Sequence, residues 1–176
     1  MPSTVTLVLK SVLDGYALPL SGIHDVAHWA RVLENGLALA AQTGANIEVV
    51  KLFAVLHDPR RLDDGHDPDH GPRAAQFALK IRERLIGLSD DEFALLCKAC
   101  EGHTHERTHP DITIQTCWDS DRLDLGRVGI TPHPTRLWTD AARLPATIKW
   151  AYDRAISDYV PSFVKDEWEI DLPASR

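Results

Sequence analysis

Cysteine is scarce in this chain of 176 residues, which holds only Cys97, Cys100 and Cys117. An odd and sparse set does not suit the disulfide framework of a small secreted domain. Long apolar runs are also lacking, because no stretch approaches the roughly 20 residues of a membrane-spanning helix. Lys10 and Asp14 interrupt the mildly apolar N-terminal segment, and no signal-peptide cleavage site follows it. We therefore expect a cytoplasmic protein with no membrane partner.

Positive charge is in deficit, since the formal net charge is -7 and no basic stripe runs along the chain. This balance makes duplex nucleic acid a poor partner. An acidic protein that binds a phosphate ester needs a local cation, which can be a metal ion or a group of arginines. The composition leaves the oligomeric state open.

Strand-like alternation is scarce as well, and the helical periodicity of apolar residues dominates. The length suits one domain with a sizeable core, and no repeat or linker interrupts it. We expect an all-α, compact, single-domain helical bundle over residues 1–176, with a motif-bearing core at about 22–143 and a C-terminal helix and peripheral tail at 144–176. The expected helices cover residues 25–42, 46–58, 72–85, 90–101, 113–126 and 146–160, with a short helix within 131–144.

Four polar residues interrupt these apolar patterns. His28 lies on an apolar row of the first expected helix, and His57 ends the apolar face of the second. Asp58 stands directly before Pro59, which ends that helix and places the carboxylate at the negative end of the helix dipole. Asp121 lies on the apolar row of the helix at 113–126. Burying these groups without partners is costly, and one shared divalent cation would compensate all four.

In their order and context, these residues resemble the H…HD…D signature of the HD-domain metal-dependent phosphohydrolase superfamily. His28 stands in HWARV, His57 and Asp58 in FAVLHD, and Asp121 in DSDRLDLGRVGI, so the resemblance covers residues 22–143. It implies a helical HD-type fold and a divalent metal ion held by these four residues. It also implies hydrolysis of a nucleotide or another small phosphate ester.

Two imidazoles and two carboxylates suit Mn, Fe, Co, Ni or Mg and tolerate Zn, so the residues do not distinguish among these metals. Asp121 is predicted to be the distal ligand because Asp119 and Asp124 are less centred on the apolar row. Zinc-like spacing also occurs in Cys97-x-x-Cys100-x-x-His103-x-His105, but buried thiols on an apolar helix are the commoner interpretation.

The loop at 57–71 is rich in histidine, aspartate and arginine. Certain HD nucleotidases carry a glutamate one turn after the His-Asp pair, where this chain has Arg60-Arg61-Leu62. This departure leaves the general acid or base open. The candidates for catalysis are Asp58, Asp64 and His70.

Further histidines and arginines are candidates for supporting roles. A second metal ion, or an orienting contact to the first, is predicted for His24, His70 and His103, with simple surface exposure as the alternative. Phosphate or substrate binding is predicted for Arg60, Arg61 and Arg122, with pairing to nearby aspartates as the alternative.

Two other functions stay open beside hydrolysis. One is a metal-loaded or degenerate HD module that binds a ligand and regulates a partner. The other is a redox enzyme with two iron ions, a di-iron HD-type oxygenase, which would need His70 and His103 as ligands.

Overall fold

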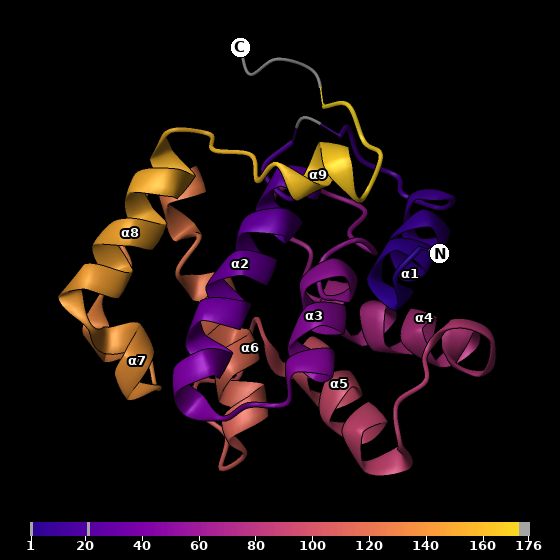
Figure 1. The fold of residues 1–176 in the computed structure, drawn as a ribbon, viewed down its shortest axis with the longest axis horizontal. Helices are drawn as coiled ribbons and strands as arrows, with labels where there is room; N and C mark the ends of the chain where they lie inside the picture. The colour runs from indigo at the N-terminus through magenta and orange to yellow at the C-terminus, as the bar shows by residue number, and fades with distance from the viewer. Residues whose placement is uncertain (1, 21, 173–176) are drawn as a thin grey trace.

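The computed structural model describes residues 2–20 and 22–172, and every regular element within them is helical. The all-α, single-domain prediction is confirmed. Helices α2 (Val26–Thr43) and α3 (Ile47–Leu56) form the centre, with α6 (Ile112–Arg122) packed on α2 and α5 (Asp90–Gly102) packed on α3 (Figure 1). Around them lie α1 (Thr4–Leu13), α4 (His70–Leu85), α7 (Asp140–Arg143), α8 (Pro145–Ile156), α9 (Phe163–Asp166) and the short 3₁₀ helices η1 (Leu125–Val128) and η2 (Pro134–Arg136). Within the described ranges, no helix combines the length and apolar character that a bilayer crossing requires.

Local sequence fixes where the central helices begin. Asp25 caps α2 by accepting the backbone N–H of His28, and Asn46 caps α3. Ser89 caps α5 and forms a capping box with Glu92 at its start. Such caps satisfy N–H groups that have no partner inside the helix. The cap on α2 therefore also fixes the helix end from which His28 projects.

The core differs from the sequence prediction at both ends of the chain. The expected helices do not include α1, although Val5, Val8 and Val12 follow helical spacing and are buried. The tail beyond α8 is not peripheral, because Val164 and Trp168 join the main core with 1% and 3% exposure. Figure 1 shows α9 crossing over one end of α2. Both terminal segments therefore complete the bundle.

The helix around Asp121 is shorter than predicted. It ends at Arg122, and the expected last turn becomes η1, with Asp124 at its start. The change of helix type turns the Asp124 side chain inward toward α2, where it contacts His28.

Helices α4 and α5 approach each other closely at Gly71. A Cβ atom at this position would lie 2.6 Å from the carbonyl oxygen of Cys100 and 3.0 Å from that of Glu101. Only glycine allows this approach without a backbone shift. It places His70, at the start of α4, opposite His103, which follows α5.

Candidate metal centre

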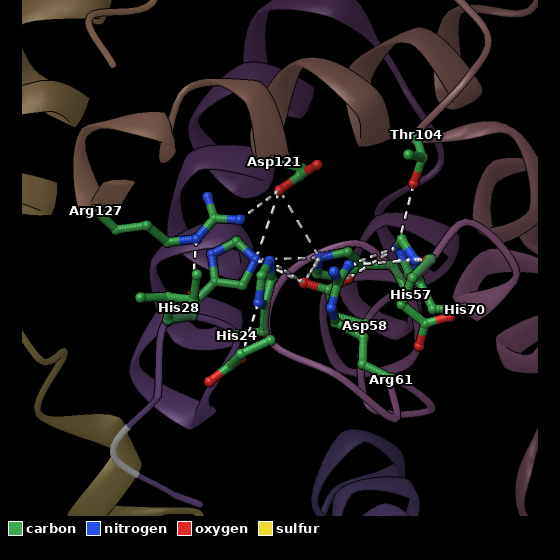
Figure 2. Close-up of polar contacts among 12 residues, drawn as sticks. His24, His28, His57, Asp58, Arg61, His70, Thr104, Asp121 and Arg127 are labelled. Atoms are coloured by element: carbon green, nitrogen blue, oxygen red, sulfur yellow. Dashed lines mark hydrogen bonds and ion pairs between the residues drawn. The ribbon is translucent and has the colours of Figure 1, made fainter. Parts of the chain in front are cut away.

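Four predicted ligands converge at one end of the central helices (Figure 2). His28 projects from the first turn of α2, His57 and Asp58 follow α3, and Asp121 lies in the last turn of α6. The Nε2 atom of His28 lies 3.2 Å from Nε2 of His57, 3.4 Å from Oδ2 of Asp58 and 3.5 Å from Oδ1 of Asp121. We call this group the first set.

A second group shares Asp58 with the first. The other carboxylate oxygen, Oδ1, lies 3.2 Å from Nε2 of His70 and 3.6 Å from Nε2 of His103. These two Nε2 atoms are 2.8 Å apart, and all three side chains are buried. We call Asp58, His70 and His103 the second set. The geometry thus brings together His70 and His103, which the sequence suggested for a second metal or a supporting contact.

Hydrogen bonds assign the tautomers of the first set. Nδ1 of His28 lies 2.8 Å from a carboxylate oxygen of Asp124, and Nδ1 of His57 lies 3.1 Å and 3.2 Å from the carbonyl oxygens of Phe53 and Ala54. Each of these partners is an acceptor, so each Nδ1 carries the proton. Both Nε2 atoms then present lone pairs to each other and to the carboxylates.

The second set follows the same pattern. Nδ1 of His70 donates to the carbonyl of Asp67, and Nδ1 of His103 lies 2.7 Å from the carbonyl oxygen of Cys100. Both Nε2 atoms again present lone pairs to a carboxylate oxygen. Metal-ligating histidines in proteins characteristically donate the other ring N–H to a carbonyl or carboxylate. The residues present therefore fit a divalent cation in each set.

The sequence missed Asp124 as a residue of this centre. Its buried carboxylate accepts from Nδ1 of His28 and, at 2.7 and 3.1 Å, from Nε and Nη2 of Arg31. Asp124, which the sequence places less centrally on the apolar row than Asp121, lies after α6 at the start of η1 and is buried against His28. Its spacing of three residues from Asp121 was the only sequence signal.

Asp119 is also buried but serves another segment. Its carboxylate accepts from the backbone N–H groups of Trp138 and Thr139, at 2.7 to 3.1 Å, and from the Thr139 hydroxyl at 2.9 Å. These contacts fasten the segment before α7 to α6. The structure places Asp121, rather than Asp119, with the two histidines of the first set.

His24 and Asp64 lie together at the edge of the centre. Nδ1 of His24 is 3.0 Å from Oδ1 of Asp64, and its Nε2 is 4.0 Å from Oδ2 of Asp58. Arg127, which the sequence did not select, places Nη2 3.8 Å from Oδ1 of Asp121. These residues surround the carboxylates of the first set.

The three predicted phosphate-binding arginines point in different directions. Arg61 is buried, with Nη1 3.6 Å from Oδ1 of Asp58. Arg60 instead donates to the carbonyl of Gly15 and stacks on Phe77, away from both sets. Arg122 donates to the carbonyl oxygens of Glu106 and Arg107. The alternative interpretation was that Arg60 and Arg61 form ion pairs with the loop aspartates. Arg61 instead donates hydrogen bonds to the backbone carbonyls of Asp63 and Gly65.

The cysteines do not take part in either set. Cys100 and Cys117 are buried, and Cys97 is half-buried. Among the described residues, the groups able to hold a metal ion contain no cysteine. His103 belongs to the second set, while Nε2 of His105 faces the carbonyl of Pro68 at 3.2 Å. The buried-thiol interpretation of this segment therefore fits the structure.

Burial and neighbouring charges tune the imidazoles. Burial lowers the pKa of His57 to about 3, so this ring is neutral near pH 7. Burial opposes protonation of His28 too, but hydrogen bonds to Asp124 and Asp58 outweigh it and raise the His28 pKa. Burial likewise opposes a charge on His103, but its hydrogen bond to Asp58 raises the pKa. In the absence of metal, each set thus contains one histidine that favours a proton.

The carboxylates remain ionised despite their burial. Burial acts to raise the pKa of Asp121, but the neighbouring His57 and the Arg127 charge lower it to about 2. Burial acts in the same way on Asp58, and the surrounding histidines hold its pKa well below the usual range. Charged oxygens therefore face both sets at neutral pH.

Metal binding is expected to tighten as the pH rises through and above 6.5. His28 and His103 have pKa values raised above 6.5, so their protons compete with the cation at lower pH and must leave on binding. Each competing proton weakens binding about tenfold per pH unit below the raised pKa. Calorimetry in buffers of different ionisation enthalpy would measure the proton release, which should exceed one per chain near pH 6.5 and fall by pH 9. The exposed-histidine variant His66→Gln should release the same number, and a pH-independent affinity would contradict the assignment.

Comparisons with known proteins show the fold. No family model and no curated protein matches the chain. Among solved structures, the crystal structure of a predicted HD superfamily hydrolase from an uncultured Thermotogales bacterium is similar, with a TM-score of 0.63 and 24% sequence identity. The match covers 87% of this chain and 86% of that chain. The HD-type helical fold expected from the sequence is thereby supported.

Proposed function

We propose that this protein is a metal-dependent phosphohydrolase acting on a nucleotide or another small phosphate ester. One observation supports the proposal most directly. Four imidazole Nε2 atoms with lone pairs surround the two oxygens of Asp58 in a buried site. Burial of so many acceptors around one carboxylate favours cations or added protons between them.

The two sets would hold the metal ions. His28, His57, Asp58 and Asp121 would bind one divalent cation, and Asp58, His70 and His103 would bind a second. The nitrogen and oxygen donors suit Mn, Fe, Co, Ni, Mg or Zn. When bound, such cations lower the pKa of water and neutralise charge on phosphoryl oxygens, which are the two needs of phosphate ester hydrolysis.

The residues around the sets have distinct tasks in this proposal. Asp124 fixes the orientation of His28 through Nδ1. Arg61 offers a buried guanidinium beside Asp58, where it can balance carboxylate charge or contact a phosphate oxygen. His24, oriented by Asp64, faces the same carboxylate and is placed to hold or transfer a proton at Nε2.

An iron-dependent redox activity is the second candidate. The shared carboxylate of Asp58 between two pairs of histidines favours a two-metal centre, and two iron ions would fit the donor types. A degenerate, regulatory HD module is less favoured, because all four predicted ligand residues of the first set are present and lie together.

Removal and return of metal provides the test. We expect the purified protein to release phosphate from at least one member of a panel of mononucleotides, cyclic nucleotides and sugar phosphates. Stripping with a chelator should reduce the rate at least about a hundredfold, because the cation supplies several kcal/mol of charge stabilisation. Returning individual metals should restore the rate. A rate unaffected by chelation, or no phosphate release with any metal, would contradict hydrolysis, and oxygen consumption by the iron form would favour the redox alternative.

A further inference from the structure

A cavity of about 860 Å³ lies beside the candidate metal centre. It is formed by the segments around residues 104–107, 122–125 and 130–138. Sites for small molecules in proteins span about 300–1,000 Å³, so this one can accept a whole nucleotide-sized molecule. The cavity is far larger than a single phosphate group requires.

The cavity meets the metal centre at Thr104. The hydroxyl oxygen of this lining residue lies 3.1 Å from Nε2 of His70, the atom that faces Asp58 (Figure 2). A molecule in the cavity can therefore extend one end toward the second set.

The lining carries an excess of positive charge. It contains Arg107, Arg122 and Arg136, whereas its acidic residue Glu106 is already paired with Lys98. Within residues 2–20 and 22–172, the exposed side chains of Arg107 and Arg136 form no ion pair or hydrogen bond. In a protein with a formal net charge of -7, this concentration of free guanidinium groups favours an anion locally.

Apolar side chains complete the wall. Leu125, Ile130 and Trp138 line the same cavity as the arginines. Apolar and aromatic walls with a few placed charged groups are typical of sites for organic ligands. The lining thus suits an organic body that carries an anionic group.

We infer that the cavity binds a second anionic group of the substrate, through Arg107 and Arg136. The substrate class is an organic phosphate ester with a phosphate or carboxylate remote from the ester bond that is cleaved. This inference rests on the proposed function only for the placement of the reacting phosphate at the metal centre. The anion site itself does not depend on turnover.

Binding to the metal-free protein tests the anion site. Calorimetry with adenosine 5′-monophosphate in the presence of a chelator should detect binding by the wild-type protein. The Arg107→Gln/Arg136→Gln variant should bind at least about tenfold more weakly, because it loses charge-assisted hydrogen bonds. The Lys80→Gln/Arg84→Gln variant removes the same charge from the exposed side of α4 and should bind like the wild type. Undetectable binding by the wild-type protein, or equal affinity in the first variant, would overturn the inference.

A comparison of hydrolysis rates in the metal-loaded protein tests the substrate class. Adenosine 3′,5′-bisphosphate, which has a second phosphate, should be hydrolysed with a kcat/KM at least about tenfold above that of the monophosphate. A terminally carboxylated phosphate ester tests the carboxylate in the same way. The preference should fall to near unity in the Arg107→Gln/Arg136→Gln variant, and a preference unchanged there would overturn the inference. Arginine-dependent binding without hydrolysis of any ester would instead refute the proposed function and retain the anion site.

Discussion

The Asp58→Ala variant is expected to lose both metal ions and all measurable hydrolysis. Its two oxygens face different sets, with Oδ2 3.4 Å from Nε2 of His28 and Oδ1 3.2 Å from Nε2 of His70. Removing one side chain therefore takes a ligand from each cation at once. Elemental analysis should find up to two metal ions per chain in the wild-type protein and almost none in the variant. Phosphate release should fall to the level of the chelated protein.

Two further variants protect this test against simple misfolding. Asp58→Asn keeps the shape of the side chain but removes its charge, and it should also lose metal. Asp69→Ala alters an exposed aspartate whose side chain makes no capping hydrogen bond, so it should retain metal and activity. A fully folded Asp58→Ala protein with wild-type metal content would contradict the assignment of Asp58.

Replacement of Asp119 and Asp121 by alanine is expected to have opposite consequences. Asp121→Ala should weaken metal binding by at least about a hundredfold, because a ligand carboxylate is lost. Its free energy of unfolding without metal should change little. Asp119→Ala should lower that free energy by about 3–5 kcal/mol, because the buried N–H groups of Trp138 and Thr139 lose a charged acceptor. Its metal content per folded chain should remain that of the wild type.

Urea unfolding of the metal-free proteins and elemental analysis of the folded proteins measure these two effects. Loss of metal in Asp119→Ala with retention in Asp121→Ala would reverse the assignment. Because the two residues are the same type and lie two positions apart in α6, each variant serves as the control for the other.

The main ligands were predictable because each departs from a local pattern. His28 and His57 interrupt apolar helix faces, and Asp58 stands before a proline that ends its helix. Each of these signals comes from the few residues around the ligand and needs no knowledge of the fold. By contrast, the contacts of Asp124 with His28 and Arg31 join positions more than 90 residues apart, and no local pattern reveals them.

The sequence also could not predict that the two carboxylate oxygens of Asp58 face different sets. This arrangement depends on which helix end faces each carboxylate oxygen, and that is fixed by packing. The same reason explains the different placements of Arg60 and Arg61. They are neighbours in a nonhelical turn after Pro59, so one guanidinium reaches the buried centre while the other stacks on Phe77.

Because α4 and α5 approach each other closely at Gly71, the first set and the second set differ in how well they tolerate small backbone shifts. The first set is joined by side chains from helices locked together by the main core, so small backbone shifts can be absorbed by rotamer adjustment. The second depends on a gap between main chains, and a methyl group at residue 71 would press on carbonyl oxygens that cannot rotate away. Spreading α4 from α5 would separate His70 from His103 while leaving His28 and His57 in place. One added methyl group at residue 71 would therefore disrupt the second set and leave the first set in place.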